Sequence, residues 1–517
     1  MIHEIDIRIP YTFIHDEAFI KKEAAAVLKL KESEITHVEV KKRSLDARKR
    51  DIKYNLRLAV YVNESYAEQT EFFFPKKIDP AKKVIIIGCG PAGIFAALRA
   101  LELGIKPILF ERGKDVRARR RDLARIHKEH VVNPESNYCF GEGGAGTYSD
   151  GKLYTRSKKR GNTQKALEWF VHFGADKDIL VNAHPHIGTN RLPGIIQKMR
   201  EAIIGCGGEV HFDSKLTDIR IVQNQIRSIQ INEQTWHDCE QLILATGHSA
   251  RDIFQLLFDR GVKIEAKPFA LGVRIEHSQN LIDEIQYHGL HNDENLPPAS
   301  YSLVAQVDGM GVYSFCMCPG GIVAPCATGT EEVVTNGWSP SKRNNPYSNS
   351  GMVVQIEPHH LGKNYATNPF ICLDFQKEVE HTCWIAGGKT QAVPAQRLLD
   401  FIQGKISTDF PETSYQPGLK SADLNTVLPA MIATRLKKAF VEWEKKMPGF
   451  LTNEAVLHAP ESRTSSPVKI PRNEETLEHV EIAGLYPCAE GAGYAGGIMS
   501  AAVDGMNCLE RIAFKFS

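Results

Sequence analysis

The chain has 517 residues with a formal net charge of +1, and 42% of its residues are hydrophobic. A chain of this length can bury two or three full cores, and its balanced charge excludes a strong global attraction to nucleic acid or to an anionic membrane. The 11 cysteines are scattered without CxxC spacing, and the sequence has neither a signal-peptide pattern nor an apolar run near 18 residues. These features predict reduced thiols, no membrane span and a cytoplasmic location.

The first 76 residues have the pattern of a small α+β domain. Ile5, Ile7 and Ile9 alternate as in a strand, Asp16 is placed to cap a helix, and residues 56–62 resemble a further strand. Residues 41–53, KKRSLDARKRDIK, contain seven basic side chains and two acids. This segment is either an RNA-docking surface or a set of solvated strand ends, and the scarcity of interleaved aromatic residues favours the second interpretation.

The most informative stretch is residues 82–112, which has the pattern of a dinucleotide-binding βαβ unit. A buried strand is followed by GCGPAG, a helical pattern, a second strand and an acid 18 residues after the last glycine. The three glycines are expected to allow a tight turn, close approach of a pyrophosphate and close helix packing, and the acid is expected to bind a ribose. The predicted cofactor residues are Gly88, Gly90, Pro91, Ala92, Gly93, Glu111 and Arg112.

A second glycine-rich stretch, NYCFGEGGAGTYSDGKLY, covers residues 137–154. No helical pattern follows its glycines, so it is not a second Rossmann unit. Closely spaced glycines predict a backbone that lies against a ligand and points amides at it, and the alternative is a surface loop. The predicted cofactor residues here are Gly143, Gly144, Ala145, Gly146 and Thr147.

A helical pattern over residues 192–206 then leads to short strands and a β meander at residues 221–231. Residues 241–248, QLILATGH, predict another buried strand that ends in Ala-Thr-Gly. Leu216, Ala245, Thr246 and Gly247 are placed in the cofactor site.

Residues 266–455 predict an inserted, mostly antiparallel α+β domain that binds the substrate. Strands are expected at residues 271–275, 302–307, 311–315 and 352–356, and helices at residues 395–402 and 428–443.

The cysteines of this region do not predict a metal site. Cys316 and Cys318 are one residue apart on a predicted strand and so point to opposite faces, which favours packing or a turn at the cofactor over a shared metal. Dithiol chemistry is the alternative for this pair. Cys326, Cys372 and Cys383 lack the spacing of zinc ligands.

Four long motifs carry a family resemblance. They are GEGGAGTYSDGKL from Gly141, FCMCPGG from Phe315, ESRTSSPVKIPR from Glu461 and LYPCAEGAGYAGGIMSAAVDG from Leu485. With the GCGPAG turn and the ATG strand, they resemble the bacterial FAD-dependent dehydrogenase family of unassigned substrate, within the glutathione-reductase-type FAD-binding flavoproteins. The resemblance covers nearly the whole chain. It implies FAD and an oxidoreductase role, and it supplies no substrate.

The last of these motifs completes the expected cofactor site. Too few residues follow it for a separate NAD domain. Related flavoproteins carry Gly-Asp at this position, touching the ribityl chain, and Glu490 stands in for that aspartate here. The helix that starts near Gly497 is expected to direct its positive end at the flavin, so Glu490, Gly491, Gly497 and Ile498 are predicted cofactor residues.

The sequence therefore predicts an α/β fold with three parts. Residues 1–76 form the N-terminal α+β domain, residues 77–265 and 456–517 form a Rossmann-like FAD-binding domain of the glutathione-reductase type, and residues 266–455 form the inserted substrate domain.

The predicted function is an FAD-dependent oxidoreductase that transfers hydride to or from an unidentified small molecule. NAD(P)H is expected only as a transient co-substrate, and neither a metal nor a nucleic-acid partner is predicted. Lys152, Arg463 and Cys318 are the candidate catalytic residues, because cations stabilise a reduced flavin and thiols can exchange electrons. The alternative is an FAD-containing RNA-associated or RNA-modifying protein. The sequence leaves open the substrate, the oligomeric state and whether Cys316 or Cys318 is redox-active.

Overall fold

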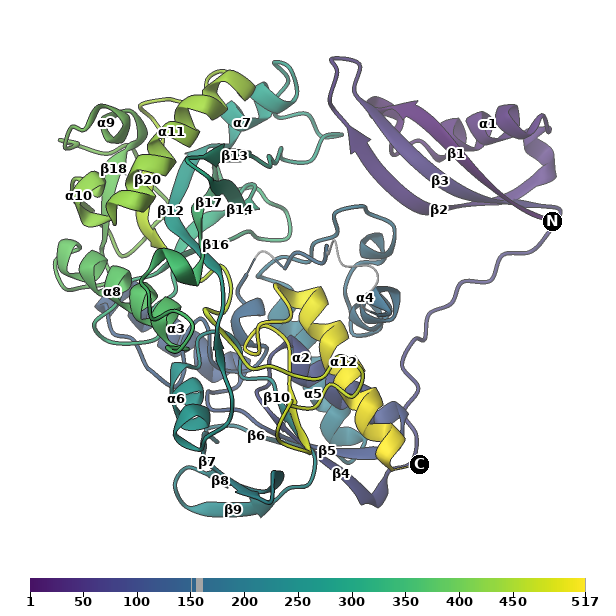
Figure 1. Cartoon of the computed structure of the whole chain (residues 1–517). Coiled ribbons are helices and arrows are strands. Elements are labelled where there is room, and N and C mark those ends of the chain that lie inside the picture. The colour runs from purple at the N-terminus through teal and green to yellow at the C-terminus, as the bar shows by residue number, and fades with distance from the viewer. Residues whose placement is uncertain (150, 155–160, 517) are drawn as a thin grey trace.

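The computed structural model describes residues 1–149, 151–154 and 161–516. Asp150 of the second glycine-rich stretch therefore lies outside the described residues. The fold is mixed α/β, and three of its sheets define the architecture (Figure 1).

The N-terminal domain is a three-stranded antiparallel sheet of order β1-β3-β2 with one α-helix packed on it. The Asp16 carboxylate accepts a hydrogen bond from the Phe19 amide at 2.9 Å, which caps the helix as predicted. Figure 1 shows this domain beside the rest of the molecule, joined to it by an extended linker. The elements are β1 (Ile2–Pro10), α1 (Glu17–Leu28), β2 (Ile35–Asp46) and β3 (Lys53–Val62).

A five-stranded parallel sheet of order β22-β10-β4-β5-β6 forms the nucleotide domain. Its strands are β4 (Asp79–Ile87), β5 (Ile105–Phe110), β6 (Glu209–His211), β10 (Leu242–Leu244) and β22 (Leu485–Pro487). Helices α2 (Pro91–Glu102) and α12 (Ile498–Lys515) pack against each other, so the C-terminal segment returns to the first βαβ unit. The sheet is buried and its strands are rich in isoleucine and leucine, as expected for a parallel sheet covered on both faces.

Further elements surround this sheet. The helices are α3 (Val116–Glu129), α4 (Thr163–His172), α5 (Leu192–Gly205) and α6 (Arg251–Asp259). A separate antiparallel sheet contains β7 (Leu216–Val222), β8 (Gln225–Ile231) and β9 (Thr235–Asp238), which is the predicted meander.

The third part is a seven-stranded sheet of order β13-β14-β17-β12-β20-β18-β19, antiparallel except for its β18–β19 pair. Its strands are β12 (Phe269–Ser278), β13 (Val304–Val307), β14 (Met310–Cys318), β17 (Tyr347–Ile356), β18 (Val393–Arg397), β19 (Leu419–Ser421) and β20 (Val456–Glu461). Its helices are α7 (Gln279–Gln286), α8 (Ile371–Ala386), α9 (Leu398–Gln403), α10 (Leu424–Val427) and α11 (Ala430–Lys446). Two-stranded pairs join β11 (Glu265–Ala266) to β21 (Val468–Lys469) and β15 (Ile322–Pro325) to β16 (Thr335–Trp338).

Two sequence expectations change here. The boundary expected between residues 455 and 456 falls before β20, which pairs with both β12 and β18, so the chain leaves this sheet only after Glu461. The helix expected at residues 395–402 begins only at Leu398, because residues 393–397 pair with β19 and β20 as strand β18.

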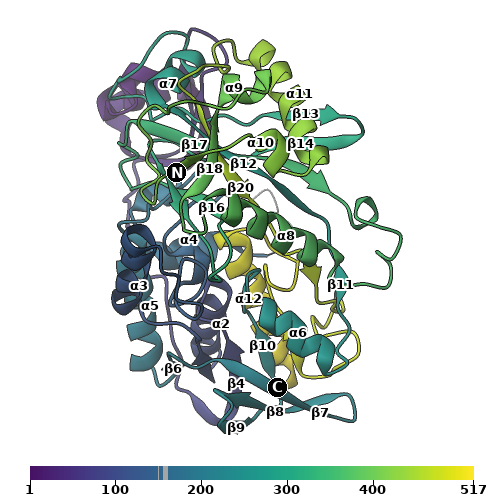
Figure 2. The same ribbon diagram turned by 90° about the vertical axis from the view of Figure 1, so that its left-hand side faces the viewer.

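In both Figure 1 and Figure 2 the seven-stranded sheet lies towards one end of the molecule and the nucleotide domain lies towards the other. The space between the two sheets is where the glycine-rich segments meet, as the cavity described below shows. Within the described part of the chain, no helix is both long and apolar enough to cross a membrane.

Candidate functional site

A cavity of about 640 Å³ lies between the nucleotide domain and the seven-stranded sheet. Its floor is made by the carboxyl ends of β4, β5 and β10 and by the first turns of α2 and α12. Phe315 and Cys316 of β14 and Asn336 of β16 contribute from the other side. Open parallel sheets bind ligands at the carboxyl ends of their strands, so this position is the expected one for a ligand site.

The GCGPAG turn has the geometry that a phosphate-binding turn needs. Gly88 has φ +103°, and a Cβ on Gly93 would lie 1.9 Å from the Gly88 carbonyl oxygen, so both positions require glycine for the backbone itself. Gly90 differs, because a Cβ there would meet only the Gly144 Cα, at 3.8 Å. The absent side chain of Gly90 therefore leaves room in the cavity, where a ligand can approach the backbone.

Glu111 joins three loops at the end of β5. Its Oε2 accepts the Cys89 amide at 2.8 Å, and its Oε1 accepts the amides of Gly113 and Gly141, both at 2.9 Å. The side chain is buried and still lines the cavity. This carboxylate therefore fixes the phosphate turn against the second glycine-rich segment.

The second glycine-rich segment, residues 137–147 and called the glycine loop below, is held from behind by Arg119 of α3. The Arg119 guanidinium is fully buried and donates to the carbonyls of Asn137, Glu142 and Gly144 at 2.7, 2.9 and 3.0 Å. The Thr147 hydroxyl donates to the Glu142 carbonyl at 2.9 Å. Sequence reasoning missed Arg119, because a basic residue in an arginine-rich helix gives no sign of being buried.

The start of α12 closes the cavity from the C-terminal side. A Cβ on Gly146 would lie 3.0 Å from the Ile498 side chain, so the glycine loop and the start of α12 are in contact. Gly496 and Gly497 face open space, since a Cβ on either would meet no atom within 4 Å. The first amides of α12 have no partner within the helix and give this end a positive partial charge.

Glu490 brings a carboxyl group to the same wall. Burial is the main cause that raises the pKa of this carboxyl to about 8; the neighbouring Cys139 and Cys316 act in the same direction, and the Lys267 ammonium opposes the shift. Glu490 is therefore mostly protonated at neutral pH and can donate a hydrogen bond. Beside it, His248 also lines the cavity, and burial with two nearby arginines lowers its pKa to about 3, so its ring is neutral.

Sixteen of the predicted cofactor residues line the cavity: Gly88, Gly90, Pro91, Ala92, Glu111, Arg112, Gly144, Ala145, Gly146, Leu216, Ala245, Thr246, Gly247, Glu490, Gly497 and Ile498. Gly93, Gly143, Thr147 and Gly491 lie behind that wall. Gly491 packs on the backbone, because a Cβ there would lie 2.7 Å from the Gly247 carbonyl oxygen. Gly143 donates its amide to the Cys89 carbonyl at 2.7 Å, which ties the glycine loop to the phosphate turn.

Of the three candidate catalytic residues, Arg463 lines the cavity but has no donor to spare. Its guanidinium donates to the carboxylates of Glu332 and Glu380 and to the hydroxyls of Ser249 and Thr328. These contacts use all five of its N–H groups. Arg463 therefore belongs to an ion-pair network in which two arginines, Arg463 and Arg251, are balanced by two glutamates.

Lys152 and Cys318 differ in position. Lys152 lines the cavity, and its ammonium donates to the Met317 carbonyl, which links the segment after the glycine loop to β14. Cys318 is fully buried, and the cavity wall contains Cys316 in its place. A bulge between Phe315 and Cys318, with Cys316 at φ +47°, breaks the strand alternation assumed for these residues.

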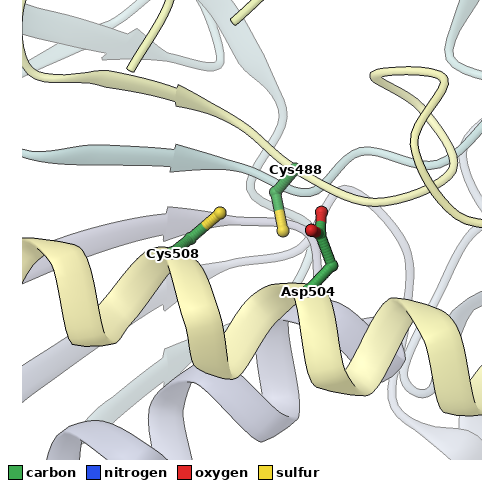
Figure 3. Close-up of side chains that lie close together, drawn as sticks. All are labelled: Cys488, Asp504 and Cys508. Atoms are coloured by element: carbon green, nitrogen blue, oxygen red, sulfur yellow. The ribbon is translucent and has the colours of Figure 1, made fainter. Parts of the chain in front are cut away.

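Cys488, Asp504 and Cys508 form a cluster outside the cavity, with their potential ligand atoms within 4.8 Å of one another (Figure 3). Arg472 donates to both Asp504 oxygens, at 2.6 and 2.9 Å, and lies 3.7 Å from the Cys508 sulfur. The Ala489 amide also donates to Asp504, at 2.7 Å. The Arg472 guanidinium is itself a cation at this point. Its ion pair with Asp504 ties α12 to the segment that follows β21, and its hydrogen bond to the Pro487 carbonyl reaches the end of β22.

Residues 268–464 match the family model described as "FAD-dependent protein, C-terminal domain-like", and residues 1–61 match a domain of unknown function. An uncharacterised protein of Clostridium beijerinckii is 38% identical over 517 residues, covering 96% of each chain.

The solved structures that match are distant. The halogenase PltM is 10% identical with a TM-score of 0.38, covering 84% of this chain and 69% of the halogenase. A geranylgeranyl bacteriochlorophyll reductase-like protein of Thermoplasma acidophilum is 11% identical with a TM-score of 0.37, covering 84% and 79%. Both scores are too low to support an inference about this chain.

Proposed function

We propose that this chain, which belongs to the same family as the Clostridium beijerinckii protein, is an FAD-dependent oxidoreductase that transfers a hydride between bound FAD and a small molecule. FAD is its cofactor, in agreement with the family model that matches residues 268–464. The observation that carries the proposal is the cavity, because glycine backbone, two helix N-termini and a buried acid meet there at the ends of parallel strands.

The residues of the cavity fit FAD. A carboxylate has about four acceptor positions, and backbone amides fill three of those on Glu111, so Oε2 keeps one for a ribose hydroxyl. Gly247, Gly496 and Gly497 present backbone without a neighbour within 4 Å of a Cβ position. The amides that begin α2 and α12 have no helical partner and suit the pyrophosphate and the electron-rich edge of the flavin.

FAD, when bound, supplies the hydride chemistry, and the protein supplies orientation and charge. Lys152 places a positive charge at the cavity wall, which favours the reduced and anionic form of the cofactor, whereas the charge of Arg463 is balanced by its two glutamates. Glu490 holds a proton on its carboxyl group at neutral pH, which makes it the candidate donor of a proton or a hydrogen bond inside the cavity. We also propose that the FAD-binding domain is of the glutathione-reductase type and that a nicotinamide donor binds only transiently.

The substitution Gly90→Ala tests whether the cavity holds FAD. A Cβ at this position clashes with no protein atom but fills the space that the phosphate needs, so we expect the FAD dissociation constant to rise at least tenfold with no change in the urea midpoint of the flavin-free protein. Fluorescence titration with FAD measures the first quantity. Gly194→Ala, which meets no atom within 4 Å and lies outside the cavity, is the matched control. Unchanged FAD affinity in Gly90→Ala would place the cofactor elsewhere.

Anaerobic titration tests the oxidoreductase activity. We expect NADH or NADPH to bleach the flavin absorption of the holoprotein, and a quinone, disulfide or enone acceptor to restore it. A folded, flavin-containing protein that none of these compounds reduces or reoxidises would contradict a hydride-transfer role while leaving FAD binding intact.

A further inference from the structure

Two thiols from distant parts of the sequence meet at the wall of the cavity. Cys139 belongs to the glycine loop and lines the cavity, and Cys326 follows β15 and is packed behind it. Their sulfur atoms are 3.6 Å apart although 187 positions separate the two residues. We propose that Cys139 and Cys326 form a redox-active dithiol that exchanges with small disulfides that enter the cavity.

The surroundings of the pair give the two sulfurs different roles. The Ser249 hydroxyl donates to the Cys139 sulfur at 3.3 Å, and Arg463 donates to that hydroxyl at 3.1 Å, so a buried positive charge lies one hydroxyl away from the thiol. A hydrogen bond from Cys326, together with Arg463 and Ser249, lowers the pKa of the Cys139 thiol, and the same pairing raises the pKa of Cys326. Cys139 is therefore the thiolate that attacks, and Cys326 is the thiol that resolves.

The exchange is balanced in atoms and electrons. The Cys139 thiolate attacks one sulfur of the small disulfide, forms a mixed disulfide and releases one thiolate. Cys326 then loses its proton to that thiolate and attacks the Cys139 sulfur, which releases the second thiolate. The protein gains one disulfide and loses two electrons, and the small disulfide is reduced to two thiol groups. The step requires that the Cys139 sulfur stay accessible from the cavity beside bound FAD, and it does not rest on the proposed hydride transfer.

The molecule contains its own control pair. Cys488 and Cys508 are also close to each other (Figure 3) and fully buried, but neither lines the cavity. Arg472, which is ion-paired with Asp504, lies 3.7 Å from the Cys508 sulfur. A small disulfide has no route to these sulfurs. If proximity alone were sufficient, both cysteine pairs would form a disulfide to the same extent. The proposal predicts that Cys139 and Cys326 form one and that Cys488 and Cys508 do not.

The experiment equilibrates the FAD-containing protein anaerobically with 2-hydroxyethyl disulfide and its thiol at graded ratios. Free thiols are then trapped with N-ethylmaleimide in denaturant, and the peptides are measured by mass spectrometry. We expect a peptide cross-linked through Cys139 and Cys326 that grows with the oxidised fraction and disappears on reduction, while Cys488 and Cys508 stay alkylated. Full alkylation of Cys139 and Cys326 at every ratio, or equal cross-linking of both pairs, would overturn the proposal.

Two variants test the separate roles of the thiols. Cys326→Ser should stop at a mixed disulfide between Cys139 and the small thiol, and Cys139→Ser should form neither product. Because either change could disturb packing, Ser249→Ala provides a milder test. It should slow the formation of the cross-link at least about threefold, since the sulfur loses its hydroxyl donor. An unchanged rate in Ser249→Ala, or a cross-link that survives in Cys139→Ser, would contradict the assigned roles.

Discussion

Glu111 shows how one side chain can serve both the fold and the site. Its two oxygens accept three amides from separate loops, so the phosphate turn and the glycine loop depend on the same carboxylate. The sequence identified this residue only by its distance from the GxGxxG turn, as a ribose ligand. Its structural role depends on Gly113 and Gly141, whose meeting in space has no signature in a linear pattern.

We expect Glu111→Gln to lower the free energy of unfolding by about 2–4 kcal/mol, because an amide has one acceptor oxygen and leaves at least one buried N–H without a partner. Urea unfolding of the flavin-free protein measures this change. Glu129→Gln is the matched control, since Glu129 is exposed and pairs with Arg125 on the same helix. Loss of FAD affinity with unchanged stability would show that Glu111 is a ligand contact alone.

Glu490 predicts a specific dependence of stability on pH. Burial raises the pKa of its carboxyl from the ordinary value of 4.5 to about 8, so the folded state keeps a proton that the unfolded state releases. The contribution of Glu490 to the free energy of unfolding is fully present below the pKa that the carboxyl has in the unfolded state. It is lost as the pH rises through about 8, because the unfolded state binds fewer protons than the folded state over this range.

Urea unfolding of the flavin-free proteins measures this effect. Between about pH 5.5 and 8.5, the free energy of unfolding of the wild type should fall by about 1–3 kcal/mol more than that of Glu490→Gln. The glutamine side chain has the same shape as the protonated acid and does not titrate, so all other titrating groups cancel in the comparison. Parallel curves for the two proteins would show that the Glu490 carboxyl is ionised in the folded state.

Arg463 illustrates what a sequence motif cannot supply. Its position in ESRTSSP predicted a catalytic cation, and the structure places its side chain at the cavity wall, but the pattern gave no sign of the two glutamates that engage it. Those glutamates come from a loop and from α8, more than 80 residues away. A buried ion pair forms only when distant elements pack together, and this information is absent from local spacing.

At the scale of elements, the close contact of α2 and α12 positions both helix N-termini at the cavity. A Cβ on Gly505 of α12 would lie 2.1 Å from the Ala92 carbonyl oxygen of α2. Only glycine therefore lets the C-terminal helix approach the first helix of the βαβ unit. This contact couples the last elements of the chain to the phosphate turn.

We expect Gly505→Ala to lower the free energy of unfolding by about 1–3 kcal/mol and to weaken FAD binding, because the two helices must move apart. Gly194→Ala in α5 should leave stability unchanged or raise it by up to about 1 kcal/mol, since alanine favours helix and meets no atom within 4 Å. Thermal unfolding with and without FAD measures both effects. Equal stability of the two variants would contradict the packing argument.

Elements with a local sequence signal were predicted well. Elements whose type depends on pairing between distant strands were predicted less well. The βαβ unit, the helix capped by Asp16 and the meander were predicted because turn glycines, caps and alternation are local signals. Residues 395–397 of strand β18 were taken as helix because the apolar run continues into α9, and the pairing of β18 with β19 and β20 separates the two. Neither α7 nor α8 was predicted.

At the scale of the whole molecule, Arg43 is one of the residues that join the N-terminal domain to the rest of the chain. The Arg43 backbone donates to Val181 and accepts from Ala183, at 2.8 and 2.9 Å, and its guanidinium binds Asp178 and Asn182. Arg43 belongs to the basic segment at residues 41–53 that suggested RNA binding. Four of the seven basic residues there have acidic partners, as the pairs Lys41–Glu39, Arg43–Asp178, Arg48–Asp46 and Lys53–Asp51 show.

We propose from this pairing that the basic segment is not a nucleic-acid surface. In fluorescence anisotropy with tRNA, the affinity should fall no more than about tenfold between roughly 50 and 200 mM salt, whereas a protein that contacts 6–10 phosphates loses about 10³–10⁵-fold. The charge-reversed variant Lys49→Glu with Arg50→Glu should match the wild type, because few cations of the segment are available to release counterions. A steep salt dependence that this double variant removes would instead make the N-terminal domain an RNA-docking module.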